Sequence, residues 1–295
     1  MDKILVTGVA GFIGSNLASY LLKNENNIVI GIDNFSSSTM SNLYPLLKNS
    51  RFEFLEHDLS KSITSLNTDY VYHLAGCGDL SRYFDNKYEF MLEQIQITKN
   101  IINFSIQNGA KLLLTTQNCS YEEQNEKYFK YYDTIRIIQS LVLELIESNK
   151  ISAVFASLDY VYGENLQKED SRFISKAIVS ASLGQNIVEE YDESFYFTYV
   201  GDVVCNLVKL MLNYSTRPII DICNHNLYLK SDIIKLIINY LKSNSKFETN
   251  SISQYNPNYK PEIALLDNGI ELTCKTPVLE GILKTIQYFK LMYFS

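Results

Sequence analysis

The chain has 295 residues, of which 46% are hydrophobic, with a formal net charge of −7 at pH 7 and a pI near 5.1. This length allows one large α/β domain or a domain with a smaller lobe, and the acidic balance argues against a protein that binds nucleic acid by neutralising phosphates. Five cysteines without a C-x-x-C pair indicate reduced thiols. The charged start Met1-Asp2-Lys3 is no signal peptide, and no apolar run has the length of a membrane span. We therefore expect a soluble cytoplasmic protein that does not bind membranes.

A glycine-rich turn follows the first predicted strand. Residues 3–7 form a short run rich in β-formers, Gly8, Gly11 and Gly14 follow at three-residue spacing, and apolar side chains recur at helical intervals from Phe12 onward. Such a strand, turn and helix can present backbone amides at a helix N-terminus to a pyrophosphate, and the helix dipole favours the negative charge. Gly8 would permit the turn, Gly11 the close approach of the phosphates, and Gly14 the packing of helix on strand.

An acidic residue ends the second predicted strand. Residues 28–32 are apolar and Asp33 follows, 19 residues after Gly14 (33 − 14). This is near the spacing at which a carboxylate binds the ribose hydroxyls of a dinucleotide. A carboxylate there would repel a 2′-phosphate, so the pattern favours NAD over NADP. The alternative is an ordinary β–α turn in which Asp33 caps a loop.

Strands and helices continue to alternate as far as residue 158. Residues 36–50 are polar and then helical by pattern. The further predicted strands are 51–55, 69–74, 111–116 and 151–158, with long helices at 85–108 and 132–148. This alternation predicts an α/β fold with a doubly wound parallel sheet. His73, on the strand at 69–74, is more simply a packed strand residue than a catalyst.

Four stretches carry a recognisable pattern. They read Thr7-Gly8-Val9-Ala10-Gly11-Phe12-Ile13-Gly14, Asp33-Asn34-Phe35-Ser36-Ser37, His57-Asp58-Leu59 and Val71-Tyr72-His73-Leu74-Ala75-Gly76. Together they resemble the extended branch of the short-chain dehydrogenase family, which contains nucleotide-sugar epimerases, dehydratases and decarboxylases. The resemblance implies a Rossmann-like fold and an NAD site at Gly8, Gly11, Phe12, Ile13, Gly14, Asp33, Asn34, Asp58, Leu59, Leu74, Ala75 and Gly76. In that family the pair matching Asp58 and Leu59 contacts the adenine ring. The plainer interpretation is that Asp58 caps the next short helix, and the two roles are compatible.

Beyond residue 158 the alternation loosens. The expected helices are 173–183, 203–213, 232–242 and 279–289, and the expected strands are 187–190, 195–200 and 219–222. This part looks like the smaller substrate lobe of the family, with Tyr199-Val200-Gly201-Asp202-Val203 where relatives have Y-V-D-D-hydrophobic and Pro277-Val278-Leu279-Glu280-Gly281-Ile282 where they have a helix-start E-G motif. We expect an NAD-binding domain over residues 1–165 and a smaller α/β lobe over 166–295, with residues 195–222 partly returning to the large domain.

The two long helices at 85–108 and 132–148 carry apolar residues around most of their circumference, which suits helices buried on more than one side. In the resembled family these helices pair with their copies in a second subunit as a four-helix bundle. The resemblance therefore implies a homodimer. Two core helices of a monomer would give the same pattern.

The resemblance also implies where the chemistry lies. Such enzymes oxidise a sugar hydroxyl with NAD, let the ketone react or rotate, and usually return the hydride. A tyrosinate takes the hydroxyl proton, and a lysine four residues later lowers the tyrosine pKa and holds the nicotinamide ribose. The best match here is Tyr132 with Arg136 in the lysine's place. Arginine keeps the positive charge but is bulkier and planar.

A serine or threonine after the fifth strand hydrogen-bonds the reacting oxygen in this family. Aligning Tyr121 with the tyrosine of the family's S-S-x-x-V-Y-G stretch places Gln117 at that position, with Thr116 one residue earlier and Glu122 in place of the glycine. Only 11 residues separate Tyr121 from Tyr132 (132 − 121), about half as many as in relatives.

Two cations are candidates for contacts with the substrate. Arg172, directly before Phe173, matches an arginine that precedes a sugar-nucleotide-contacting helix in UDP-glucuronate decarboxylases. Phe195 falls where those relatives place a diphosphate-binding arginine, and Lys176 where they have asparagine. Arg172 and Lys176 could therefore share the phosphate role, and a solvated helix start is the plainer alternative.

Two functions are compatible with these observations. The first is NAD-dependent modification of a UDP- or GDP-sugar by epimerisation, dehydration, decarboxylation or oxidation at C4, with Tyr132 as base, Arg136 as its electrostatic partner and Thr116 or Gln117 as the hydrogen-bonding group. The second is a non-catalytic NAD-binding homologue with a structural or regulatory role, which the altered positions Arg136, Gln117 and Phe195 favour.

Other site classes lack support in the sequence. The three histidines, His57, His73 and His225, are dispersed without the spacing of a metal site. A Ser/His/Asp hydrolase is equally unsupported, because the chain contains no G-x-S-x-G elbow.

Overall fold

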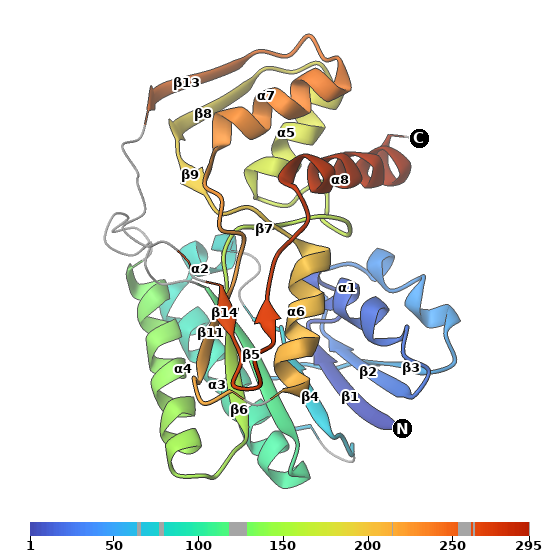
Figure 1. Cartoon of the computed structure of the whole chain (residues 1–295), viewed down its shortest axis with the longest axis vertical. Helices are drawn as coiled ribbons and strands as arrows, with labels where there is room; N and C mark the ends of the chain where they lie inside the picture. The colour runs from blue at the N-terminus through green and yellow to red at the C-terminus, as the bar shows by residue number, and fades with distance from the viewer. Residues whose placement is uncertain are drawn as a thin grey trace.

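The computed structural model describes residues 1–63, 66–76, 80–117, 129–213, 215–252, 261 and 263–294. A seven-stranded parallel sheet crosses its centre in the order β11-β6-β5-β4-β1-β2-β3 (Figure 1). The strands are β1 (Asp2–Thr7), β2 (Asn27–Asp33), β3 (Phe52–Glu56), β4 (Tyr70–His73), β5 (Lys111–Gln117), β6 (Ala153–Leu158) and β11 (Ile219–Ile222). The order reverses at β1, which pairs with β2 on one side and β4 on the other. Open α/β sheets bind ligands at such a reversal, outside the carboxyl ends of the strands.

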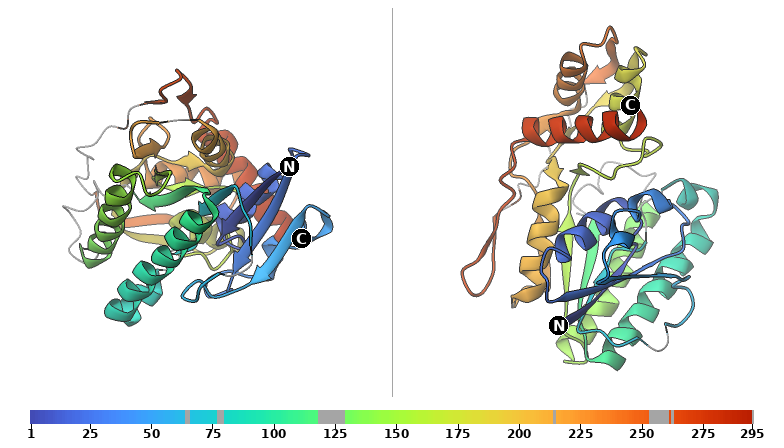
Figure 2. Two further views of the ribbon diagram at one scale, coloured as in Figure 1. Left: turned by 90° about the horizontal axis from the view of Figure 1, so that it is seen from below. Right: turned by 90° about the vertical axis from the view of Figure 1, so that its right-hand side faces the viewer.

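Helices cover both faces of this sheet, because its strands bury side chains on both sides. On β1, Ile4 and Val6 share a core with α1 (Phe12–Leu21) and α6 (Val200–Leu212). Leu5 points to the opposite face and shares a second core with α3 (Lys87–Asn108) and α4 (Phe129–Glu147). The two pairs of helices lie on opposite sides of the strands (Figure 2). This is the doubly wound α/β arrangement that the sequence predicts.

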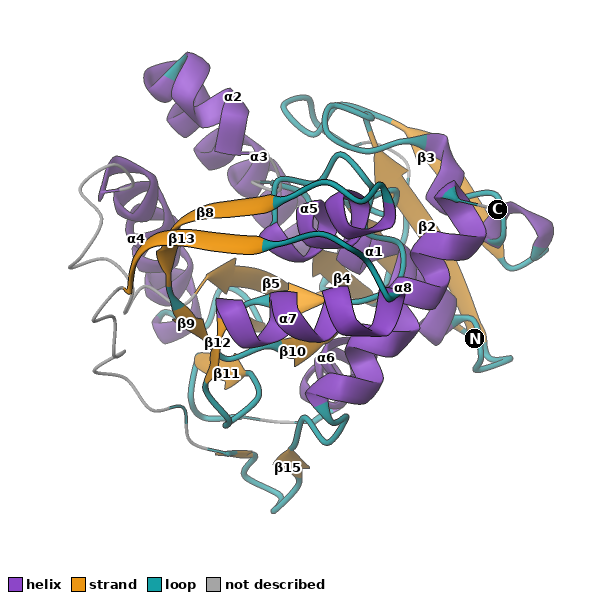
Figure 3. Ribbon diagram, turned by 90° about the horizontal axis from the view of Figure 1, so that it is seen from above, coloured by secondary structure: helices purple, strands orange, loops and turns teal. Residues whose placement is uncertain are grey.

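A smaller α/β lobe lies at the end of the sheet where the strands finish (Figure 1). Its helices α5 (Phe173–Ser182), α7 (Lys230–Leu241) and α8 (Val278–Tyr293) share a hydrophobic core of their own. Short strand pairs complete it: β8 (Ile187–Asp192) with β13 (Phe247–Ile252), β9 (Ser194–Phe195) with β12 (Tyr228–Leu229), and β10 (Thr198–Tyr199) with β7 (Val161–Tyr162). Figure 3 shows β8 and β13 side by side on the outer surface of this lobe.

Parts of the second half of the chain return to the main sheet. Strand β11 pairs with β6 and forms one edge of the sheet, and α6 packs against α1. The hairpin of β14 (Ala264–Leu265) and β15 (Glu271–Leu272) lies next to β11 and α6. The chain therefore crosses between the two cores more than once.

Three element predictions need correction. Residues 36–50 form two short 3-10 helices, η1 (Met40–Asn42) and η2 (Leu46–Lys48), because Pro45 between them has no backbone N–H to continue a helix. The helix predicted from residue 85 begins at Lys87, since Asn86 caps it by accepting from Glu89 N, and the preceding turns form the separate α2 (Leu80–Asp85). The strand predicted over 195–200 is instead two short strands, β9 and β10, which pair with different partners, and α6 begins at Val200.

Within the described ranges no helix combines the length and the apolar composition needed to cross a membrane.

Candidate functional site

A cavity of about 1060 Å³ opens outside the carboxyl ends of the sheet, at the reversal of strand order. Its volume lies slightly above the range of about 300–1,000 Å³ that is usual for small-molecule sites. Most of the predicted site residues line it: Gly8, Gly11, Phe12, Ile13, Gly14, Asp33, Asn34, Leu59, Leu74, Ala75, Gly76, Thr116, Gln117, Tyr132 and Arg172. Three predicted residues do not: Asp58, Arg136 and Lys176.

The glycine-rich turn forms the floor of this cavity. Gly8 has φ +69°, and a Cβ atom there would lie 2.8 Å from the backbone nitrogen of Ala75. A Cβ on Gly14 would lie 2.1 Å from the carbonyl oxygen of Gly8, so α1 packs on the turn only because Gly14 has no side chain. At Gly11 a Cβ would meet a single neighbour, the Gly8 oxygen at 3.1 Å, and its other sides are open. The turn therefore fits a pyrophosphate at the N-terminus of α1.

Asp33 ends β2 beside this turn and is 9% exposed. Its Oδ2 accepts a hydrogen bond from the backbone nitrogen of Ala10 at 2.9 Å, and its Oδ1 accepts from Phe35 N and Ser38 Oγ, both at 2.9 Å. Asp33 thus caps its own loop and also borders the cavity. An ionised carboxylate has about four lone-pair sites, so these three bonds leave capacity for a ribose hydroxyl.

A buried pair shapes the opposite wall. Thr7 Oγ1 accepts from the backbone nitrogens of Leu74 and Ala75, both at 3.2 Å, and lies 2.8 Å from His73 Nδ1. Burial lowers the pKa of His73 to about 4, so the imidazole is neutral at pH 7 and its Nδ1 can accept the Thr7 proton. The pair fixes the end of β4, where residues 74–76 line the cavity.

Asp58 lies just outside the cavity wall, in a turn of its own. Its carboxylate accepts from the backbone nitrogen of Ser60 at 2.9 Å, and this bond is the main reason that the pKa of Asp58 is lowered. The neighbouring Leu59 is buried and does line the cavity. Leu59 can therefore contact a ligand in the cavity, whereas Asp58 does not border it.

The catalytic candidates gather on β5 and α4. Thr116 and Gln117 end β5, and Thr116 Oγ1 accepts from Gln139 Nε2 at 3.3 Å. Tyr132 is half-buried and lines the cavity from α4. The structure thus brings Thr116, Gln117 and Tyr132 to one space. The alignment residues Tyr121 and Glu122 lie outside the described residues.

Arg136 takes a different direction from Tyr132. The cavity side of α4 consists of Tyr131, Tyr132, Thr134, Ile135 and Ile138. Arg136 forms a salt bridge with Asp133 and its side chain is 45% exposed. Solvent therefore screens its charge from the cavity.

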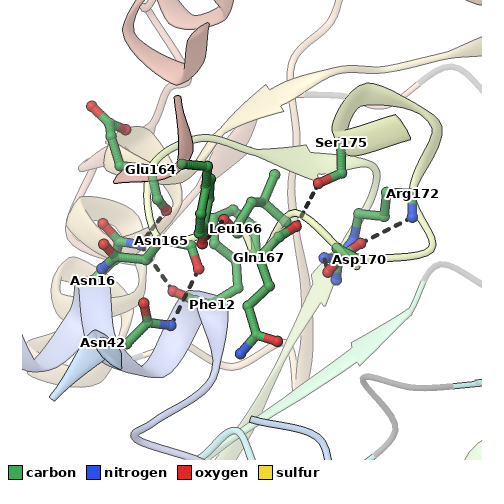
Figure 4. Close-up of polar contacts among 11 residues, drawn as sticks. Phe12, Asn16, Asn42, Glu164, Asn165, Leu166, Gln167, Asp170, Arg172 and Ser175 are labelled. Atoms are coloured by element: carbon green, nitrogen blue, oxygen red, sulfur yellow. Dashed lines mark hydrogen bonds and ion pairs between the residues drawn. The ribbon is translucent and has the colours of Figure 1, made fainter. Parts of the chain in front are cut away.

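Arg172 lies across the first turn of α1. It is the residue before α5, its guanidinium carbon is 5.3 Å from the centre of the Phe12 ring, and its Nη1 donates to Asp170 Oδ2 at 2.7 Å (Figure 4). Lys176, one helical turn further on, is exposed. Of the two predicted cations, the structure therefore places Arg172 in the cavity lining and Lys176 outside it.

The comparisons with known proteins agree with this geometry. Residues 4–223 match the model of the NAD dependent epimerase/dehydratase family. The chain belongs to this family. The resemblance drawn from the glycine turn, Asp33 and residues 71–76 is therefore confirmed.

Relatives in the epimerase/dehydratase family share about a quarter of the sequence. UDP-glucuronic acid decarboxylase 6 of Arabidopsis thaliana is 26% identical over 95% of this chain and 86% of its own. UDP-glucuronic acid decarboxylase 1 of Danio rerio is 25% identical over 97% of this chain and 72% of its own.

Solved structures establish the fold. UDP-glucose 4-epimerase of Thermotoga maritima, solved with UDP-glucose, superimposes with a TM-score of 0.83 at 19% identity, covering 98% of this chain and 99% of its own. UDP-glucuronic acid 4-epimerase of Bacillus cereus, solved with UDP-glucuronic acid and NAD, gives 0.82 at 22% identity over 99% and 100%.

Sequence reasoning missed the contacts that close this epimerase/dehydratase fold over α1. Asn16 Nδ2 donates to the carbonyl of Glu164 at 2.9 Å, Asn42 Nδ2 to the carbonyl of Asn165 at 3.2 Å, and Asn165 Nδ2 to Ser15 Oγ at 3.0 Å (Figure 4). Asn165 has φ +66°, a conformation that asparagine tolerates in turns. Gly163 and Asn165 indicate a turn in the sequence, but no sequence pattern indicates that Asn165 contacts the distant residues Ser15 and Asn42.

The described side chains contain no group of three or more His, Cys, Asp or Glu residues that could hold a metal ion.

Proposed function

We propose that this chain is an NAD-dependent enzyme that modifies a nucleotide sugar through a 4-keto intermediate. The observation that carries the proposal is one cavity that joins the glycine-rich turn and Asp33 to Thr116, Gln117 and Tyr132. Membership of the epimerase/dehydratase family and the UDP-sugar enzymes among its relatives support it. Hydride transfer between a sugar and a nicotinamide requires that one cavity hold both the dinucleotide and the reacting carbon of the sugar.

The cofactor residues follow from the walls of the cavity. Residues 8–14 would hold the pyrophosphate, Asp33 and Asn34 the adenosine ribose, Leu59 the adenine, and residues 74–76 with Tyr132 the nicotinamide half. Bound NAD would supply the acceptor that takes and returns the hydride of the sugar carbon.

The chain's own residues would handle the proton. The Tyr132 phenolate takes the proton of the sugar hydroxyl as that carbon is oxidised, and returns it when the ketone is reduced. Thr116 or Gln117 donates a hydrogen bond to the same oxygen and orients it. Arg136 supplies a positive charge one helical turn beyond Tyr132. Because the side chain of Arg136 is 45% exposed and bound to Asp133, its effect on Tyr132 is weaker than that of a buried lysine.

We further propose that the enzyme works as a homodimer through α3 and α4. On α3, Tyr88 is 67% exposed and Leu92 is 46% exposed, and on α4, Ile137 is 43% exposed and Leu141 is 50% exposed. Each pair has i, i+4 spacing and so lies on one face of its helix. The two helices pack against each other, so the faces can form a continuous apolar surface for a second copy.

The proposal is tested by the absorbance of reduced nicotinamide. UDP- and GDP-sugars are added to the NAD-loaded protein, and the transient band and the sugar products are followed. Tyr132→Phe should abolish any change. The matched control is Tyr44→Phe, which removes the hydroxyl of a tyrosine that is 61% exposed and does not line the cavity. A wild type that retains NAD but stays silent with every nucleotide sugar would instead support a non-catalytic NAD-binding homologue.

A further inference from the structure

The chain between β7 and α5, residues 163–172, forms one wall of the cavity, and we call it the connecting segment. It contains no helix or strand. Most of its residues line the cavity: Asn165, Gln167, Glu169, Asp170, Ser171 and Arg172. Because an irregular segment has no ladder of backbone hydrogen bonds, the position of this wall depends on the contacts that the segment makes with its neighbours.

One side of the connecting segment is fixed to the smaller lobe. Leu166 is fully buried in the core that α5, α7 and α8 share, and its carbonyl accepts from Tyr293 Oη at 3.3 Å. The carbonyl of Gln167 accepts from Ser175 Oγ in the first turn of α5 (Figure 4). These contacts make the segment a part of the lobe.

The other side of the connecting segment is fixed to the glycine-rich turn and α1. Asn42 is 5% exposed, and its Nδ2 donates to the carbonyl of Asn165 at 3.2 Å and to the carbonyl of Ala10, within the turn, at 3.0 Å. Asn165 Nδ2 donates to Ser15 Oγ at 3.0 Å, and Ser15 Oγ donates to the carbonyl of Gly11 at 2.8 Å. Two links therefore join the segment to the residues that we propose for the pyrophosphate.

Asn42 and Ser15 can affect a ligand only through the segment and the turn, because neither residue lines the cavity. Hydrogen bonds that restrain an irregular segment raise the fraction of molecules in which the wall has its binding geometry. The apparent Kd of a ligand rises as that fraction falls. The two links therefore favour tight binding without touching the ligand.

We propose that Asn42 and Ser15 are positioning residues, which hold the connecting segment against the glycine-rich turn and thereby set the wall at 165–172 for the nucleotide sugar. The inference rests on the proposed function, since it assigns this wall to the substrate. It makes substrate affinity depend on two residues of the dinucleotide-binding part of the chain.

The first test needs no ligand. Lys168 lies in the connecting segment and its side chain is 52% exposed, so a protease that cleaves after lysine measures how often the segment opens. A hydrogen bond contributes about a factor of five to such an equilibrium. The double variant Asn42→Ala with Ser15→Ala should therefore be cleaved after Lys168 at least about tenfold faster than the wild type. Mass spectrometry of the fragment that ends at Lys168 measures the rate.

The matched control is Asn27→Ala. Asn27 is 6% exposed, its Nδ2 donates to the carbonyl of Leu21 at 2.9 Å, and it begins β2 at the end of the sheet opposite the cavity. This variant should lose stability and keep the wild-type rate of cleavage after Lys168. If cleavage in the control rises as much as in the double variant, the effect follows global stability and the proposal is overturned.

The second test measures affinity for the substrate. UDP-glucose is titrated calorimetrically at an NAD concentration that saturates each variant, so that a change in NAD affinity does not enter. Each single substitution should weaken binding by less than about fivefold, because one link remains. The double substitution should weaken binding by more than the product of the two single effects, because both links hold one segment. Asn27→Ala should bind as the wild type does.

The outcomes separate this proposal from the proposed function. If the wild type binds UDP-glucose and the double variant binds it equally well, the positioning role fails and the proposed function stands. If the NAD-loaded wild type binds no UDP- or GDP-sugar, the proposed function fails and the role in substrate affinity with it. If the double variant does not fold, Asn42→Ala and Ser15→Ala are each compared with Asn27→Ala by cleavage after Lys168, and equal rates overturn the proposal.

Discussion

Replacing Gly11 with alanine should separate cofactor binding from folding. A Cβ at Gly11 would meet the Gly8 carbonyl oxygen at 3.1 Å and nothing else within 4 Å. A shift of a few tenths of an ångström relieves that contact, so the free energy of unfolding should fall by about 1 kcal/mol or less. The added methyl group, however, borders the cavity where a pyrophosphate must approach the amides of the turn.

The loss of affinity can be estimated from the hydrogen bonds at risk. A hydrogen bond to a charged group contributes about 1.5–3 kcal/mol, and about 1.4 kcal/mol corresponds to a factor of ten in Kd. Losing even one such bond should weaken NAD binding about tenfold or more in Gly11→Ala.

Calorimetric titration with NAD, combined with thermal unfolding of the free protein, measures both quantities. The control is Gly109→Ala, at a glycine that does not line the cavity, where nothing lies within 4 Å of the added Cβ but φ is +62°. That variant should lose stability, by about 1 kcal/mol, and keep its affinity for NAD. Wild-type affinity in Gly11→Ala would refute the placement of the pyrophosphate over this turn.

Three further results are expected. Burial lowers the pKa of His73 from 6.5 to about 4. Between these pH values the unfolded chain binds more protons than the folded chain, so the free energy of unfolding should fall by up to about 3 kcal/mol as the pH drops from 6.5 to 4. Above pH 6.5 this contribution should be constant. Urea unfolding across this range checks the slope, and a flat profile would contradict a buried neutral imidazole. If the proposed dimer forms, Leu141→Glu should give monomers in sedimentation experiments, whereas Leu183→Glu, at a similarly exposed leucine that ends α5, should leave it intact. Arg136→Met should lower turnover by no more than about tenfold, because a screened surface charge contributes about 1 kcal/mol or less; a loss as large as that of Tyr132→Phe would show that the guanidinium acts directly.

The main sheet could be predicted from the sequence because its strands are buried on both faces. Residues 28–32 form a continuous apolar run, and residues 151–158 form one that only Ser152 and Ser157 interrupt. Parallel strands covered by helices on both sides need such a composition. The glycine turn could also be predicted, because its glycines are required locally. The atoms that leave no room for a Cβ on Gly14 belong to Gly8 and Val9, and those that leave none on Gly8 belong to Leu74 and Ala75, directly after the adjacent strand β4. Local pattern and tertiary packing agree in this half of the chain, which forms the side of the cavity where we propose that the dinucleotide binds.

The second half was harder to predict because its elements are short and their partners are distant. Strand β8 pairs with β13, which lies about 60 residues later (247 − 187), and no periodicity in either stretch reveals the other. Lys230 has the appearance of an ordinary surface lysine at a helix start, yet its partners Glu189 and Glu193 bury it. The choice of partner is set by packing of the whole lobe, so the wall of the cavity that Glu193 lines could be found only in the structure.

The most direct test of the account is a calorimetric titration of the purified, cofactor-free protein with NAD and with NADP. The glycine turn and Asp33 predict that NAD binds in one site per chain and that NADP binds at least about tenfold more weakly, since the 2′-phosphate would approach a carboxylate. Failure to bind either dinucleotide, or a preference for NADP, would contradict the assignment of this cavity.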